Sequence, residues 1–220
     1  MSVKGFWSST IGKKQIVGVC GLLLTGFLLT HMLANLLILF SAELYNWYSY
    51  KLISNPLIYI AEAGLIALFA LHVINAIRLQ LTNKSARDSK YAVDINGEKG
   101  ISFASKTMIH TGMIILIFTV YHLITFKFGT YYSVSYDGQE MRDLHRLVLE
   151  VFQSPIYTIG YVVALALLGF HLSHGIASAI KTVGFNHPAY NKKVELGGAA
   201  LAWVIAGGFI VQPLYVFFIH

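Results

Sequence analysis

Five long apolar stretches dominate this chain and restrict it to one kind of architecture. They run over Gln15–Phe40, Leu57–Gln80, Thr107–Phe126, Ile156–Ile180 and Leu196–Ile219. A helix needs roughly 20 apolar residues to cross the hydrocarbon layer of a membrane. The stretches are continuous, whereas the strands of a membrane barrel alternate between apolar and polar residues. The sequence therefore predicts an all-α integral membrane bundle of five transmembrane helices, which forms a single domain over residues 1–220.

The composition agrees with a membrane protein. Hydrophobic residues make up 56% of the chain and charged residues only 12%, against about a quarter charged residues in soluble domains. The first apolar stretch is too long for a secretory signal peptide and has no small-residue cleavage site. We therefore expect it to be a membrane helix of the mature protein.

The basic residues indicate which way the bundle crosses the membrane. If the N-terminus lies inside, the outer segments hold only four of the 16 basic residues: Lys51, Lys127, Arg142 and Arg146. The inner segments hold the others: Lys4, Lys13, Lys14, Arg78, Lys84, Arg87, Lys90, Lys99, Lys106, Lys181, Lys192 and Lys193. Lysine and arginine gather on the cytoplasmic side of membrane proteins. We therefore expect a cytoplasmic N-terminus, an external C-terminus, and no nucleic-acid partner for the net positive charge.

The segments between the stretches carry weaker signals. The inner segment Thr82–Ser105 is polar and basic and is the expected docking surface for a soluble partner. In the outer segment Lys127–Ser154, apolar residues recur at helical spacing and predict a short surface helix that ends before Pro155. These residues are Met141, Leu144, Leu147, Val148 and Val151. Aromatic residues after the first stretch predict an interfacial belt: Tyr45, Trp47, Tyr48 and Tyr50.

One histidine on each of the first four stretches is the strongest functional signal: His31, His72, His122 and His171. Histidine inside a bilayer is costly and is rare there without a function. A six-coordinate haem iron can take one imidazole from each of two helices. Four histidines on four helices therefore predict two haems b enclosed by the first four helices. For one histidine alone, a hydrogen bond between helices is an equally good explanation.

The depth of each histidine sorts the four into two pairs. At about 1.5 Å of rise per residue, His31 and His122 lie roughly 24–25 Å from the nearest inner lysine. His72 and His171 lie roughly 9–15 Å from the inner face by the same measure. We therefore predict an outer pair, His31 with His122, and an inner pair, His72 with His171, each binding one haem iron.

Residues beside the histidines suggest how the haems are accommodated. Glycines on the first two stretches leave room for a flat macrocycle, or simply let helices approach closely: Gly18, Gly21, Gly26 and Gly64. Cations near the inner face are candidates to neutralise the inner haem propionates: Lys181, Arg78 and Lys106. His174 and His110 are further candidates for a propionate, and His174 is also an alternative to His171 as the iron ligand.

A quinone that is reduced or oxidised needs a proton donor or acceptor beside its ring. Glu62 is the only carboxylate within the five stretches, and an ionisable residue inside the membrane is a functional candidate. Glu43 lies near the same outer level. These residues predict an outer quinone site near the outer haem, while an inner site near Ser8 and Ser9 is the alternative.

Several of these motifs resemble one known family. The stretch Phe170–Gly175 (FHLSHG), followed by Thr182–Tyr190 (TVGFNHPAY), resembles the cytochrome b subunit of succinate dehydrogenases and fumarate reductases. The most similar type is the single-subunit, five-helix anchor with two haems. Shorter motifs fit the same family: Ser9–Lys14 (STIGKK), Thr30-His31 with Asn35, Leu71-His72 and Tyr121-His122. The similarity extends from about Ser8 to Tyr190.

The resemblance implies a function within a larger complex. Such an anchor binds an iron–sulfur subunit and a flavoprotein subunit, which carry the iron–sulfur clusters, the FAD and the dicarboxylate chemistry. Electrons pass through the proximal haem (His72, His171) and the distal haem (His31, His122) to or from a quinone, expected to be menaquinone. The resemblance places the chain in a bacterial inner membrane, within respiratory complex II of the tricarboxylic acid cycle, where the whole complex can form a homo-oligomer. It leaves the direction of the reaction open.

Two other functions are compatible with the same residues. The chain could be the di-haem anchor of another quinone-linked enzyme, such as a hydrogenase or a formate dehydrogenase. It could instead be a haem-free membrane transporter whose histidines relay protons.

Overall fold

Five long helices form the body of the protein in the computed structural model. They are α2 (Thr10–Asn35), α4 (Leu57–Ser85), α5 (Phe103–His122), α7 (Pro155–Thr182) and α8 (Pro188–Ile219). The structure describes residues 5, 9–85 and 103–219, without the side chains at positions 84, 85 and 103–106. Within these residues, five helical segments are long and apolar enough to cross a membrane. The prediction of five helices that are long and apolar enough to cross a membrane is confirmed.

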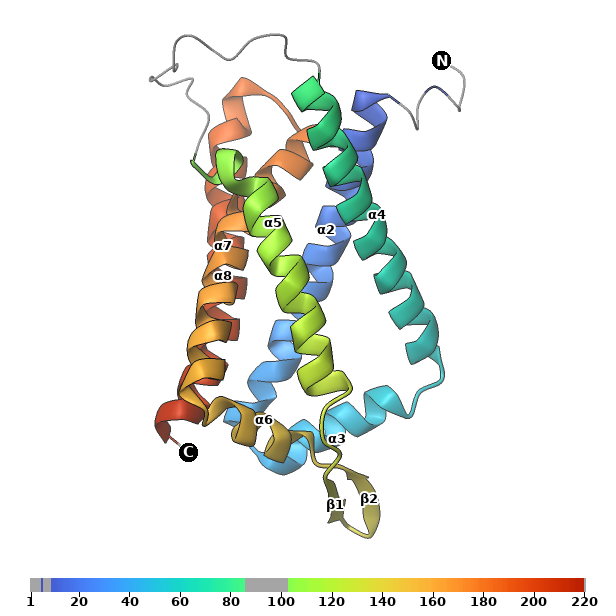
Figure 1. Ribbon diagram of the computed structural model, residues 1–220, viewed down its shortest axis with the longest axis vertical. Coiled ribbons are helices and arrows are strands. Elements are labelled where there is room, and N and C mark those ends of the chain that lie inside the picture. Colours follow the sequence, from blue (N-terminus) through green and yellow to red (C-terminus); the bar gives the residue numbers. More distant parts are fainter. Residues whose placement is uncertain (1–4, 6–8, 86–102, 220) are drawn as a thin grey trace.

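The five helices run alternately up and down the bundle (Figure 1). Helices α7 and α8 pack side by side along their length. Helix α4 packs closely on α2 but touches α5 little, and it leans away from the other helices toward the end opposite the N-terminus (Figure 1). Most of the predicted docking segment Thr82–Ser105 lies outside the described residues.

The helix ends differ from those of the predicted stretches, and the starts of α2 and α8 have a local cause. Helix α2 begins at Thr10, before the apolar stretch, because the Ser9 side chain accepts a hydrogen bond from the Gly12 N–H at 3.0 Å and caps the helix. Helix α8 begins at Pro188 and not at Leu196, since proline fits the first turn of a helix. The longer α8 places Glu195 within a candidate span, so the prediction that Glu62 is the only carboxylate there was wrong.

The end of the bundle away from the N-terminus carries a cap of short elements (Figure 1). The cap consists of α3 (Ala42–Ile53), the strands β1 (Ser133–Tyr136) and β2 (Gln139–Arg142), and α6 (Leu144–Phe152). The strands form an antiparallel hairpin in which Tyr136 pairs with Gln139. Its two turn residues, Asp137 and Gly138, have φ of 52° and 78°, as a type I′ turn requires. The fold is therefore helical with one small hairpin and not purely all-α.

The cap corrects two predictions from the sequence. The predicted surface helix forms as α6, but Met141 lies on β2 and is buried. The aromatic residues after the first stretch belong to a helix, α3, that was not predicted. Tyr45 of this helix is only 5% exposed, so it is a core residue and not part of an interfacial belt.

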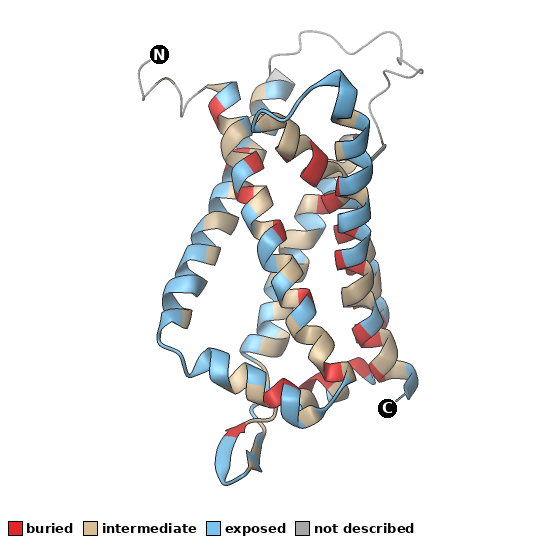
Figure 2. Cartoon of the chain, turned by 180° about the vertical axis from the view of Figure 1, so that it is seen from behind, coloured by how far each residue is buried: buried red, intermediate tan, exposed pale blue. Residues whose placement is uncertain are grey.

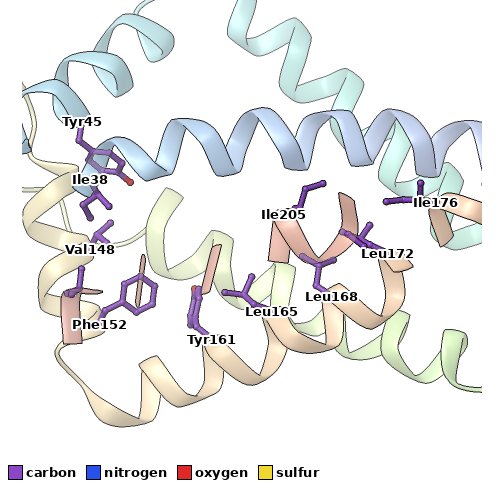
Figure 3. Close-up of a cluster of buried hydrophobic side chains, with 12 residues drawn as sticks. Ile38, Tyr45, Val148, Phe152, Tyr161, Leu165, Leu168, Leu172, Ile176 and Ile205 are labelled. Carbon is purple, nitrogen blue, oxygen red and sulfur yellow. The ribbon is translucent and has the colours of Figure 1, made fainter. Parts of the chain in front are cut away.

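The buried core lies on one side of the bundle and under the cap. Figure 3 shows Leu165, Leu168 and Leu172 of α7 beside Ile205 of α8, and the same cluster continues to Phe152 and Tyr45 of the cap. Buried residues follow α7 and α8, whereas α4 is largely exposed or half-buried (Figure 2). Gly169 allows the close α7–α8 packing, because a Cβ there would come within 2.8 Å of the Trp203 ring.

Candidate functional site

The four predicted histidines face one another in two pairs across the bundle. The ring centroids of His31 (α2) and His122 (α5) are 5.9 Å apart. Those of His72 (α4) and His171 (α7) are 6.5 Å apart. The structure thus brings together the same two pairs that the depth estimate groups.

These separations fit a metal ion held between two imidazoles. An imidazole nitrogen binds a metal at about 2 Å and lies about 1 Å from the centre of its ring, so two rings on opposite sides of one ion are separated by roughly 6 Å. Both pairs are close to this value. All four side chains are half-buried, which leaves part of each ring accessible to a bound group. The residues present therefore fit two haem irons, and each iron would be held by one pair of histidines.

At the inner pair, the His72 ring lies directly against the backbone of α2. Its Nδ1 is 3.1 Å from the carbonyl oxygen of Val17. That carbonyl belongs to the helical turn that ends at Gly21, and a Cβ on Gly21 would lie only 3.3 Å from His72 Cε1. Gly21 therefore gives the ring access to the Val17 carbonyl. A carbonyl can only accept, so Nδ1 carries the proton and Nε2 keeps a lone pair for a metal.

His171 is held in the same way by α5. Its Nδ1 is 3.2 Å from the Thr111 hydroxyl oxygen. That hydroxyl donates its one hydrogen to the carbonyl of Thr107 or Met108, each 3.1 Å away, so its oxygen accepts from the ring. A Cβ on Gly112 would lie 3.3 Å from His171 Cε1. Both inner rings thus combine an oxygen acceptor with a glycine on the neighbouring helix.

At the outer pair, aromatic rings surround the two histidines. His122 lies 5.4 Å from the Phe126 ring and 6.0 Å from the Phe118 ring, between centroids. Its Nδ1 is 3.5 Å from the hydroxyl oxygen of Tyr161 on α7. The outer pair is therefore surrounded by aromatic rings, with the Tyr161 hydroxyl beside His122.

His31 stacks on Phe27 with ring centroids 5.2 Å apart and lies 5.7 Å from Phe209 of α8. The fifth helix thus contributes to the outer site, although the sequence predicted a site enclosed by the first four helices. Gly208 permits this contact, since a Cβ there would come within 2.4 Å of Met32 Sδ.

The candidate propionate contacts lie toward the end of the bundle where α2 begins. Lys181 forms an ion pair with Glu195, which joins α7 to α8. His174 lies within electrostatic range of both residues, while the ring of His171 is the one that faces His72. Arg78 is exposed on α4, and His110 is exposed near the start of α5. The side chain of Lys106 lies outside the described residues.

The candidate quinone residues lie toward the cap. Glu62 forms an ion pair with Lys127, the last residue of the π-helical segment Leu123–Lys127 that follows α5, and this pair joins that segment to α4. The two side chains are 38% and 42% exposed, so Glu62 is neither deeply buried nor held by a neutral hydrogen bond. Glu43 is exposed in the first turn of α3. The alternative inner site is only partly described, because Ser8 lies outside the described residues while Ser9 caps α2.

The other glycines separate into two kinds. Gly18 faces Ala179 and Thr182 of α7, with a Cβ distance of 3.5 Å to Ala179 Cα, and so serves helix packing. Gly26 and Gly64 have nothing within 4 Å of an added Cβ among the described residues. Of the four glycines that the sequence singled out, only Gly21 touches a histidine ring.

Sequence reasoning missed most of the groups that hold the rings. Val17 acts through its backbone, which leaves no trace in the side-chain pattern. Thr111 and Tyr161 come from other helices and cannot be matched to a histidine by spacing. Glu195 was placed outside the fifth stretch.

Comparison with models of known protein families, with curated protein sequences and with solved structures finds no match for this chain.

Proposed function

We propose that this chain is the cytochrome b membrane subunit of a succinate:quinone oxidoreductase, a succinate dehydrogenase or fumarate reductase. The observation that carries the proposal is the two histidine pairs, 5.9 and 6.5 Å apart between ring centroids, on four different membrane helices. The family is suggested by the FHLSHG and TVGFNHPAY motifs, which lie in and after α7.

In this function the histidines hold two haems b, and haem supplies one-electron redox chemistry when it is bound. His72 and His171 offer Nε2 to the inner iron, because their Nδ1 atoms donate to Val17 and Thr111. His31 and His122 bind the outer iron. Lys181 would pair with an inner propionate in place of Glu195 if the haem were bound, since an exposed ion pair such as Lys181–Glu195 contributes only about 0–1 kcal/mol.

Glu62 exchanges the proton that accompanies quinone chemistry at the outer level, with Glu43 as the second candidate. Glu62 forms an ion pair with Lys127, and its carboxylate is a group that can exchange a proton with a quinone or quinol. The substrate is a quinone, menaquinone in this proposal.

The partners of the proposed complex are an iron–sulfur subunit and a flavoprotein with FAD, which dock at the cytoplasmic end, where α2 begins. The basic residues that gather at this end support a cytoplasmic N-terminus, and the proposed family suggests a bacterial inner membrane. The dicarboxylate reaction takes place on the flavoprotein and not on this chain.

The deciding experiment is a reduced-minus-oxidised spectrum of the purified chain, with a redox titration. Two b-type haems per chain support the proposal. Single replacements His72→Ala and His122→Ala should each remove one haem and leave the other. A folded chain that binds no haem would rule the proposal out and favour a transporter. Co-purification of flavin and iron–sulfur clusters separates this complex from other quinone-linked enzymes.

The residue roles have separate tests. Glu62→Gln should slow quinone reduction or quinol oxidation while leaving both haem spectra unchanged, and unaltered quinone kinetics would remove Glu62 from the mechanism. Lys181→Ala should change the potential of the inner haem alone, and an unchanged potential would exclude Lys181 as a propionate contact.

A further inference from the structure

Two side chains connect the His31 ring to the cap. Asn35 lies one turn after His31 on α2, and its amide nitrogen is 3.4 Å from Nδ1 and 3.5 Å from Nε2 of the ring. The same nitrogen donates to the His31 carbonyl at 2.9 Å. On its other side, the amide oxygen of Asn35 accepts a hydrogen bond of 2.9 Å from the Tyr45 hydroxyl.

Tyr45 is itself firmly placed. It is only 5% exposed and belongs to the core cluster shown in Figure 3. Burial raises the pKa of Tyr45 above its ordinary value, and the nearby charge of Arg142 offsets this only in part. The hydroxyl therefore keeps its hydrogen at neutral pH and continues to donate it to Asn35.

The next residue on α3 ties this helix to the rest of the cap. Asn46 is fully buried; its amide nitrogen donates to the Asp143 carboxylate at 2.8 Å, and its amide oxygen accepts from the His145 N–H at 2.9 Å. Asp143 in turn caps α6 by accepting from the Arg146 N–H at 3.0 Å. Helix α3 thus has a fixed position, from which Tyr45 reaches α2.

We propose that Tyr45 is a positioning residue for His31, acting through the amide of Asn35, so that the cap sets the orientation of the outer ring. This inference rests on the proposed function, because it concerns how His31 presents itself to the outer haem iron. An asparagine amide can rotate about its terminal torsion, and the Tyr45 hydroxyl stops that rotation. The inner pair has no part in this connection, since its rings are held by Val17 and Thr111.

The test replaces Tyr45 by phenylalanine in the purified full chain. Loss of a neutral hydrogen bond corresponds to about a fivefold change in an equilibrium, so Tyr45→Phe should speed transfer of the outer haem to apomyoglobin about fivefold. The low-spin electron paramagnetic resonance signal of the outer haem should shift or broaden, and that of the inner haem should stay unchanged. Tyr48→Phe is the matched control, because Tyr48 lies on the same helix and is 44% exposed.

A double-variant comparison checks that Tyr45 acts through Asn35. Asn35→Leu keeps the size of the side chain and removes the amide. If the proposal holds, adding Tyr45→Phe to Asn35→Leu changes nothing further, so the effects are not additive. Additive effects, or a Tyr45→Phe chain whose outer signal and haem transfer match the wild type, would overturn it. If the wild-type chain binds no haem, the proposed function fails together with this inference. If the wild-type chain binds two haems and Tyr45→Phe changes neither the outer haem signal nor the haem transfer, only the inference fails.

Discussion

Replacing Gly21 by alanine tests whether the inner histidine depends on close contact with the backbone of α2. The new methyl group would lie 3.3 Å from His72 Cε1 and 3.6 Å from Nδ1. Carbon atoms in contact are normally about 3.5–4.0 Å apart. The ring must therefore move away from α2 by a few tenths of an ångström, which lengthens the 3.1 Å contact between Nδ1 and the Val17 carbonyl.

The expected effect combines two costs at one ring. Crowding a packed site costs roughly 1–3 kcal/mol, and a stretched hydrogen bond loses part of its contribution of about 1 kcal/mol. Since about 1.4 kcal/mol is a factor of ten in an equilibrium constant, we expect inner haem affinity to fall about tenfold or more. This agrees with the loss of metal affinity of about 10–100-fold that follows when the hydrogen-bond partner of a metal-binding side chain is removed.

The assay is titration of haem into the haem-depleted chain in detergent, followed by absorption and electron paramagnetic resonance of each haem. Gly26→Ala is the control, because Gly26 lies on the same helix and a Cβ there meets nothing within 4 Å among the described residues. Both replacements gain the same helix propensity, about 1 kcal/mol, so their difference isolates the contact with His72. Equal inner haem affinity in the two variants would refute this account of the inner site.

Two further predictions concern the region around the cap. In Gly129→Ala the new Cβ would lie 1.9 Å from the Thr125 carbonyl oxygen, and this clash with the backbone should destabilise the chain by roughly 3 kcal/mol or more. Thermal unfolding measures the effect against Gly207→Ala, where a Cβ meets nothing within 4 Å among the described residues. Equal melting temperatures of the two variants would contradict the prediction. The Tyr132 hydroxyl donates to the Glu150 carboxylate at 2.5 Å, and this hydrogen bond raises the pKa of Tyr132. The contact therefore stabilises the fold below the ordinary tyrosine pKa, near pH 10, and is lost as pH rises through the raised value. Glu150→Gln should shift one tyrosine to lower pH in an absorbance titration near 295 nm, and an unchanged titration would show that Glu150 does not set this pKa.

The pairing of the histidines was accessible from the sequence because it depends only on distances along helices. Each long helix runs once along the bundle and rises evenly, so the number of residues between His31 and Lys14 is a measure of depth. Helix count and direction follow from the same regularity. These features need no knowledge of which helix lies beside which.

The groups that hold the rings were not accessible, because they depend on how the helices are arranged around one another. Gly21 and Gly26 look alike in the sequence, yet only Gly21 meets a ring, since α4 crosses α2 at that level. Tyr45 was predicted to be an interfacial residue because α3, which lies across the end of the bundle, has no long apolar stretch by which the sequence could identify it as a packed helix. Its burial comes from tertiary packing against α2 and α6.

The two sites are supported by different parts of the fold, and this leads to a last prediction. Gly21 and Asn35 both lie on α2 but are separated by roughly 21 Å of helix, at about 1.5 Å per residue. The two inner rings, His72 and His171, depend on a backbone oxygen of α2 and a hydroxyl oxygen of α5. The outer ring of His31 depends on aromatic neighbours and, through Asn35, on the cap.

Groups this far apart without shared partners usually contribute additively. In the double variant Gly21→Ala with Tyr45→Phe, the inner haem should therefore match that of Gly21→Ala, and the outer haem that of Tyr45→Phe. A double variant whose inner affinity falls well below that of Gly21→Ala would mean that the cap also holds α2 against α4. In that case the bundle would respond to both changes as one cooperative unit, and the description of two separately supported sites would have to be abandoned.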